Sequence, residues 1–166
     1  YMRYDVRTMG NHDVETGHAV YDKWVKEMTC PMLGANITNT ATAQPYYKPY
    51  IVFKRGGVKI AVIGLITPGV PSWLSETLWS GMHFEDAVES AKKWMDIVKK
   101  NERPDIIVGL FHTGIHDRSK TNGSLNDATL EIARRVPGFD VIFYGHDHAT
   151  HYEEVKSCDG STTIIV

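Results

Sequence analysis

The sequence has few cysteines, no long apolar run and no excess of charge of either sign. Its two cysteines, Cys30 and Cys158, are too few for a disulfide framework and lack zinc-finger spacing. No apolar run approaches the roughly 20 residues of a membrane-spanning helix, and no signal segment opens the chain. The net charge of -2 comes without a lysine or arginine run, so nothing here predicts a nucleic-acid polymer as a partner.

The composition is typical of one globular domain. Hydrophobic residues make up 42% and aromatic residues 10% of the 166 positions, which is enough for an ordinary packed core. The chain starts at Tyr1 rather than methionine and stops at Val166 inside an expected strand. We therefore expect residues 1–166 to be one α/β domain that is truncated at both ends.

Apolar runs rich in β-branched and aromatic residues predict buried strands. The clearest runs cover residues 58–66, 106–111 and 141–144. A further strand is expected at 50–53, with Gly56-Gly57 as a hairpin turn into 58–66. The hairpin makes one pair antiparallel, so the pattern predicts a mixed β-sheet.

Apolar residues at helical spacing predict helices between these strands. The strongest pattern covers residues 84–100, and a second covers 17–28. A third helix is expected over 124–136, with Ser124 and Asp127 as a capping box. Together with the strands, they indicate a sheet flanked by helices.

Three expected strands lead into histidine-bearing turns. The turns are Gly10-Asn11-His12-Asp13, His112-Thr113-Gly114 and Gly145-His146-Asp147-His148. Because ligands in parallel α/β sheets bind beyond the carboxyl ends of strands, we expect the three turns to gather at one edge. Imidazoles together with amide and carboxylate oxygens suit zinc, manganese or iron. The sequence therefore predicts a metal site at that edge.

In order and separation, these three blocks resemble the later motifs of calcineurin-like metallophosphoesterases. Tyr4-Asp5 and the Gly56-Gly57 hairpin look more narrowly like the branch that contains 5'-nucleotidases and 2',3'-cyclic-nucleotide phosphodiesterases. The resemblance covers most of the chain. It implies a mixed β-sheet sandwich of four αββα layers, a partial catalytic domain over residues 1–166, and a periplasmic, cell-surface or secreted location.

The resemblance also implies a role for each motif residue. It makes Asn11, His112 and His146 ligands of one divalent metal ion, and His148 a ligand of a second ion. His12 then donates to the phosphoryl or leaving-group oxygen, and Glu15 orients it. The implied reaction is in-line attack by a metal-bound hydroxide on a small phosphate ester, in this branch a nucleotide.

The sequence departs from the family pattern in four respects. It lacks the opening Asp-x-His and Gly-Asp motifs, which supply the first metal's ligands and the bridging carboxylate. It also lacks the carboxy-terminal domain that stacks the nucleotide base. Glu15 stands where nucleotidases usually have Asp, and Asp13 replaces the commoner Glu. We therefore expect at most one bound ion and no activity from these 166 residues alone.

Two other functions remain open from the sequence. His146, His148 and His151 approach the HxHxDH block of metallo-β-lactamase-like hydrolases, although Thr150 occupies the Asp position. A non-catalytic scaffold that keeps the fold would account for Glu15 and the missing motifs. The remaining histidines are expected to be solvated or hydrogen-bonded rather than ligands: His18, His83, His116 and His151.

Overall fold

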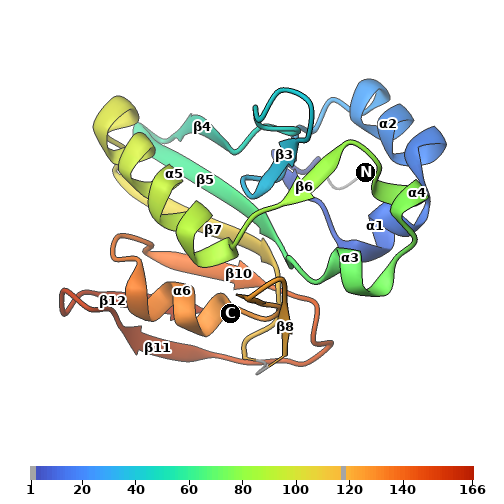
Figure 1. Cartoon of the computed structure of the whole chain (residues 1–166). Helices are drawn as coiled ribbons and strands as arrows, with labels where there is room; N and C mark the ends of the chain where they lie inside the picture. Colours follow the sequence, from blue (N-terminus) through green and yellow to red (C-terminus); the bar gives the residue numbers. More distant parts are fainter. Residues whose placement is uncertain (1–2, 117–118) are drawn as a thin grey trace.

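The centre of the molecule is a six-stranded mixed sheet. The structure, a computed structural model, describes residues 3–116 and 119–166 (Figure 1). The strand order is β11-β12-β10-β7-β5-β4, in which the four inner strands are parallel and the two edge strands antiparallel. The six strands are β4 (Tyr50–Arg55), β5 (Val58–Ile66), β7 (Ile106–His112), β10 (Val141–Tyr144), β11 (Glu153–Lys156) and β12 (Thr162–Ile165).

Smaller elements surround this sheet. Three two-stranded pairs are β1 (Arg7–Thr8) with β2 (Met32–Leu33), β3 (Ile37–Asn39) with β6 (Met82–Phe84), and β8 (Lys120–Thr121) with β9 (Ser124–Leu125). The helices are α1 (Asn11–Glu15), α2 (His18–Glu27), α3 (Val70–Trp73), α4 (Glu76–Trp79), α5 (Ala87–Glu102) and α6 (Thr129–Arg135).

Two helices cover one face of the large sheet. Figure 1 shows α5 over β5 and β7, and α6 over β10 and β12, with the two helices side by side. Their inner faces form one hydrophobic core with the sheet, and its fully buried members include Leu65, Val98, Ile132 and Ile142. The short β1–β2 pair lies against β5. The mixed α/β fold with flanking helices is thus confirmed. The expected sandwich has two large sheets, and the described residues contain one of them.

Most expected elements are present, with one clear error. The hairpin between β4 and β5 turns at Gly56 and Gly57, which both have positive φ values. The third expected helix is present, but its predicted start is wrong: Ser124 lies in β9, and α6 begins at Thr129 without a side-chain cap. The Asp127 carboxylate accepts a hydrogen bond from the Gly114 amide instead, so it is not part of a capping box.

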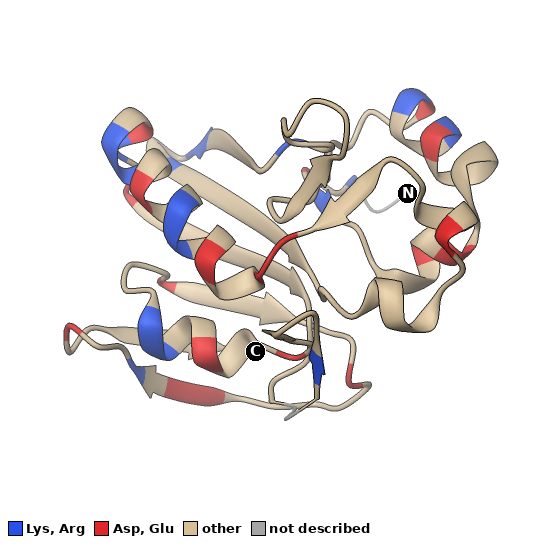
Figure 2. Ribbon diagram, in the orientation of Figure 1, with Lys and Arg blue, Asp and Glu red and all other residues tan. Residues whose placement is uncertain are grey.

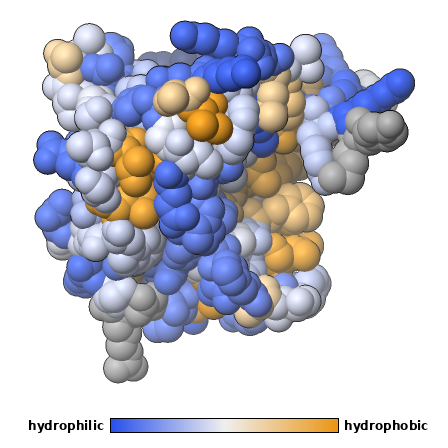
Figure 3. All heavy atoms as spheres, turned by 90° about the vertical axis from the view of Figure 1, so that its right-hand side faces the viewer, coloured by the Kyte–Doolittle hydropathy of each residue, from blue (hydrophilic) through white to orange (hydrophobic). Residues whose placement is uncertain are grey.

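The surface is of mixed character. Lys and Arg alternate with Asp and Glu along α5, and both signs of charge are interspersed over the other elements (Figure 2). On the face that carries α1, α2 and α4, apolar side chains reach the surface as patches between hydrophilic ones (Figure 3). Within residues 3–116 and 119–166, no helix is long and apolar enough to cross a membrane.

A buried asparagine fixes the carboxyl end of the central strand β5. Asn36 is fully buried, and its side-chain amide donates to the carbonyls of Ile66 and Glu85 at 2.8 and 3.2 Å. Its side-chain oxygen accepts from the Ile66 amide at 3.0 Å. These bonds satisfy backbone groups that the sheet and helices leave unpaired, and burial makes each of them costly to lose.

Replacement of Asn36 is therefore expected to destabilise the fold. Asn36→Ala leaves the Ile66 and Glu85 groups buried without partners, and should lower the free energy of unfolding by about 2–4 kcal/mol. Urea denaturation measures this. Asn101→Ala, on the exposed side of α5, is the matched control and should change stability by less than about 0.5 kcal/mol. Equal effects of the two variants would contradict the assigned role of Asn36.

Candidate functional site

The candidate site lies at the carboxyl edge of the sheet. Strands β5, β7 and β10 are parallel, so their carboxyl ends share one edge. Strand β7 ends at His112, and β10 is followed by Gly145 and His146. Strand β1, which contacts β5 and β7, leads through Met9 and Gly10 into α1. The edge therefore receives side chains from segments far apart in the sequence.

Three of the expected site residues meet at one atom. The buried Asn11 places its side-chain oxygen 2.9 Å from His112 Nε2 and 3.2 Å from His146 Nδ1. A carbonyl oxygen accepts hydrogen bonds, so each of these ring nitrogens donates to it. The two imidazole rings lie edge to face, with centroids 5.3 Å apart. The structure thus brings Asn11, His112 and His146 together.

His112 is held as a neutral imidazole. Burial, and next the neighbouring His146 ring, lower its pKa to about 4, and His12 and His148 act in the same direction through their charges. Gly10 allows this burial, because a Cβ at that position would lie 3.1 Å from the His112 ring. A neutral imidazole has a nitrogen lone pair to offer a cation near pH 7.

The chemistry of this donor set fits a divalent ion, but only as part of a coordination shell. Two imidazole nitrogens and one amide oxygen converge, which are ligand types that zinc and manganese accept. Among the described residues, no group of three or more His, Cys, Asp or Glu side chains is arranged to hold a metal ion. A metal site here would therefore draw on the Asn11 oxygen beside the two imidazoles, and it would need further ligands to be complete.

His146 has two further neighbours that sequence patterns did not indicate. The indole of Trp73, in α3, stacks on its ring with centroids 5.4 Å apart and an interplanar angle of 26°. Asp127 Oδ1 lies 3.8 Å from His146 Nε2, and both side chains are largely buried. Neither neighbour is near His146 in sequence, and an indole or a carboxylate alone is too common to be a signal.

Hydroxyl groups connect the loops around Asp127. The Asn126 carbonyl accepts from Thr67 Oγ1 at 2.7 Å and from Thr113 Oγ1 at 2.9 Å. Thr113 Oγ1 in turn accepts from the Ala128 amide, and the Thr113 carbonyl accepts from Thr129 Oγ1. These buried bonds hold the segment before α6 against the ends of β5 and β7.

His12 and Glu15 form an exposed pair on α1. His12 Nδ1 lies 2.8 Å from Glu15 Oε2, and the side chains are 66% and 43% exposed. Asp13, between them, has a structural role that the sequence did not reveal: its carboxylate accepts from the Gly10 amide at 2.8 Å and closes the first turn of α1. The longer Glu15 side chain still reaches His12.

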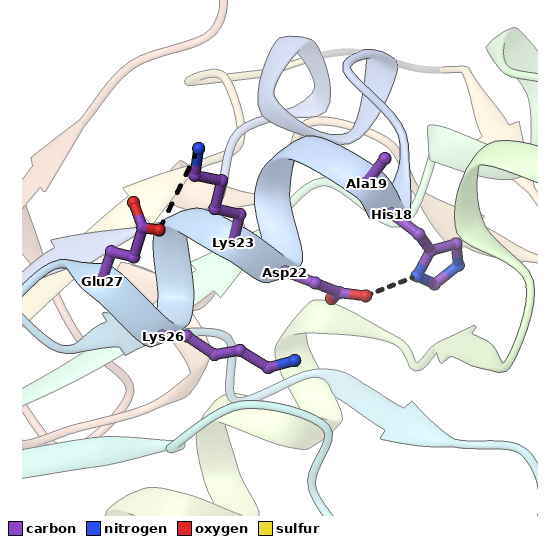
Figure 4. A pocket seen from close by; sticks show the side chains of 6 residues that line it. All are labelled: His18, Ala19, Asp22, Lys23, Lys26 and Glu27. Atoms are coloured by element: carbon purple, nitrogen blue, oxygen red, sulfur yellow. Dashed lines mark hydrogen bonds and ion pairs between the residues drawn. The ribbon is translucent and has the colours of Figure 1, made fainter.

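The other histidines are arranged less centrally. His148 is exposed, has a left-handed φ of 54°, and is joined to Asn11, His112 and His146 by none of the hydrogen bonds of the described residues. His18 lies in a hollow along α2, where it contacts Asp22 and the Ser80 carbonyl (Figure 4). His151 contacts Glu153 at 3.0 Å.

Comparisons with known proteins agree on one family. The model of the calcineurin-like phosphoesterases matches residues 2–150. Protein UshA of Yersinia enterocolitica is 36% identical over 145 residues, which are 86% of this chain and 26% of that protein. A 2',3'-cyclic-nucleotide 2'-phosphodiesterase/3'-nucleotidase of Haemophilus influenzae is 30% identical over 156 residues, 89% of this chain and 23% of that protein.

The fold comparison points the same way. The crystal structure of a 5'-nucleotidase precursor from Thermus thermophilus superposes with a TM-score of 0.80 at 25% identity, covering 99% of this chain and 33% of that one. The chain thus spans about a quarter of the length of the curated relatives it matches.

Stability should fall in mild acid because of His112. Its pKa is about 4 in the folded state against 6.5 ordinarily, so the unfolded chain binds the proton first as the pH drops. The contribution of His112 to the free energy of unfolding is fully present above pH 6.5 and is lost as the pH falls toward 4. It amounts to about 1.4 kcal/mol per unit of pKa shift. Denaturant unfolding at several pH values measures this loss. His112→Gln should flatten the dependence, and an unchanged slope would contradict the assignment.

Proposed function

The chain belongs to the calcineurin-like phosphoesterase family, and from this premise we propose that it forms part of the catalytic domain of a metal-dependent nucleotide phosphoesterase. Phosphate-ester hydrolysis is the activity that the names of two of the relatives reported above state. The finer proposal is a nucleotide phosphomonoesterase or a cyclic phosphodiesterase. Family membership also favours this reaction over that of a metallo-β-lactamase-like hydrolase.

The observation that supports metal dependence best is the convergence at Asn11. Its amide oxygen and the nitrogens of His112 and His146 would hold one divalent ion, and His148 would serve a second together with ligands outside this sequence. The bound ions would lower the pKa of a water molecule and neutralise charge on the phosphoryl oxygens. The protein's own part is to keep the His112 imidazole neutral and to keep both rings aligned.

His12 is the proposed donor to the substrate. It lies next to the ligand Asn11 in sequence, yet its ring is exposed, so it can reach a substrate oxygen without competing for the ion. The Glu15 carboxylate at Nδ1 orients the ring, and the protonated ring would donate to a substrate oxygen through Nε2–H. This arrangement argues against a scaffold that has lost its catalytic residues.

Substitution of His12 should separate catalysis from metal binding. His12→Ala in the full-length gene product is expected to lower turnover by about 10²–10⁴-fold, because one positioned donor is lost. Metal content, measured on the same preparation by mass spectrometry, should stay unchanged. Glu15→Gln should give a smaller loss. Loss of metal together with activity would show that His12 is a ligand, and a rise in activity in Glu15→Gln would discard the pair.

The 166 residues alone should bind little metal and turn over little substrate. Three converging donors do not fill a coordination shell, and this sequence contains no Asp-x-His or Gly-Asp motif to complete one. We expect at most one ion per chain and negligible hydrolysis of a chromogenic phosphate ester, with the full-length gene product as the active control. Robust turnover by the isolated chain would overturn the proposed ligand set.

The proposed location outside the cytoplasm rests on family resemblance. A periplasmic, cell-surface or secreted position would give the enzyme access to extracellular nucleotides. Fractionation of cells that express the full-length gene product tests this.

A further inference from the structure

The conformation of His146 needs support from its surroundings. Its φ is 108°, a value that residues with a Cβ rarely adopt and that costs on the order of 1–3 kcal/mol. A strained residue keeps such a conformation only when its neighbours hold it there. Four groups contact its ring: Asn11 at Nδ1, the His112 ring edge to face, Trp73 on one face, and Asp127 near Nε2.

The Trp73 contact is built into the loop after β5. The indole lies over Gly69, where a Cβ would come within 2.4 Å of the ring, so a side chain at position 69 would displace it. The backbone at Gly69 has φ -71°, which any residue adopts, so the glycine is needed for space and not for its conformation. The neighbouring Ser72 hydroxyl bonds Thr121 Oγ1 at 2.7 Å and ties α3 to β8.

The Asp127 contact is built into the segment between β9 and α6. Its neighbour Asn126 is fixed by the hydroxyls of Thr67 and Thr113, and its own carboxylate accepts from the Gly114 amide. A Cβ at Gly114 would come within 2.6 Å of that carboxylate, so glycine is required for the approach. The Asp127 side chain is 15% exposed, and the carboxylate is therefore directed inward at the His146 ring.

We propose that Asp127 and Trp73 are positioning residues that hold the His146 imidazole for metal binding. This inference rests on the proposed function, because it takes His146 as a ligand through Nδ1. A neutral imidazole that offers the Nδ1 lone pair must have its proton on Nε2, which is the nitrogen that faces Asp127. The carboxylate selects this tautomer, and the indole fixes the tilt of the ring.

The distance between His146 Nε2 and Asp127 Oδ1 is consistent with a contact that shortens when His146 binds a metal ion. At 3.8 Å, Nε2 and Oδ1 are close neighbours but are too far apart for a direct hydrogen bond. While Nδ1–H donates to Asn11, Nε2 has no obligatory proton for Asp127. When Nδ1 serves as a ligand, the ring proton must lie on Nε2, and Nε2–H can then donate to Asp127. Carboxylate partners of this kind change metal affinity by about 10–100-fold in other proteins.

The test is calorimetric titration of Zn²⁺ into the metal-depleted full-length gene product. Asp127→Asn keeps an oxygen for the Gly114 amide but removes the charge, and should weaken binding by about 10–100-fold. Trp73→Ala should weaken it by roughly 2- to 10-fold, whereas Trp73→Phe retains a stacking ring and should stay near the wild type.

Asp147→Asn is the matched control. Asp147 also accepts a backbone hydrogen bond, from the Ile115 amide at 3.0 Å, but His146 Nε2 is paired with Asp127 instead. This variant should leave Zn²⁺ affinity within about threefold of the wild type. Equal losses in Asp127→Asn and Asp147→Asn would indicate general loosening of the loop and would overturn the proposal.

A reference variant separates this inference from the proposed function. If His146→Ala leaves Zn²⁺ affinity unchanged, His146 is not a ligand and the proposed site itself fails. If His146→Ala weakens binding while Asp127→Asn and Trp73→Ala do not, the site stands and the positioning role is overturned. Should Asp127→Asn not fold, as judged by its melting curve, the Trp73→Ala and Trp73→Phe pair decides.

Nitrogen-15 NMR of the Zn²⁺-loaded protein gives an independent readout. The wild type should show His146 protonated at Nε2 and not at Nδ1. Asp127→Asn should shift the Nε2 resonance, because the charged partner is gone, while Asp147→Asn should not. An unshifted Nε2 resonance in Asp127→Asn would contradict the proposal even if the affinity changed.

Discussion

The site depends on one shared hydrogen-bond acceptor. The Asn11 side-chain oxygen accepts from His112 and His146, which are 101 and 135 positions away in the sequence. It thereby joins the helix after β1, the end of β7 and the turn after β10 into one cluster. A carbonyl oxygen has two acceptor sites, and the two imidazoles use both. The one oxygen and two nitrogens that form these hydrogen bonds are the atoms that would coordinate a divalent ion in the proposed site.

This shared contact is sustained by buried polar groups that belong to the fold. Asn36 fixes the end of β5, and Thr67 and Thr113 fix the loops that follow β5 and β7. In a weakly polar interior such bonds are strong, and their loss is costly. The edge is therefore held in place by the fold itself. Burial also keeps His112 neutral, so that its ring nitrogen could bind a cation. Burial therefore strengthens the hydrogen bonds of the fold and sets the protonation state of His112.

Sequence patterns revealed the strands, because the strand period is encoded locally, and the rule for ligand binding in parallel sheets then predicted that the three motifs meet. Apolar runs identified β5, β7 and β10, and the parallel arrangement then placed Asn11, His112 and His146 at one edge. Local patterns were misleading where a distant partner decides the outcome. Asp127 has the spacing of a capping residue from Ser124, but the Gly114 amide competes for its carboxylate.

Contacts between side chains of separate loops could not be predicted from the sequence, for the same reason. The stacking of Trp73 on His146 depends on space above Gly69, and that space exists only after α3 has folded against the sheet edge. The acid at position 13 appeared as an unexplained departure from the family pattern. In the folded chain it closes the first turn of α1 on the Gly10 amide, a task for which the shorter Asp suffices.

In the proposed site, the first motif would divide two tasks between adjacent residues. A helix turns by about 100° per residue, so neighbours on α1 face different surroundings. Asn11 is 7% exposed and faces the cluster, whereas the His12 side chain is 66% exposed and faces solvent beside Glu15. A ligand must be immobile and shielded from water, while a group that donates to a substrate must be reachable. In the proposed site, one turn of helix would meet both demands with consecutive residues, and the same turn brings Glu15, three positions on, back beside His12.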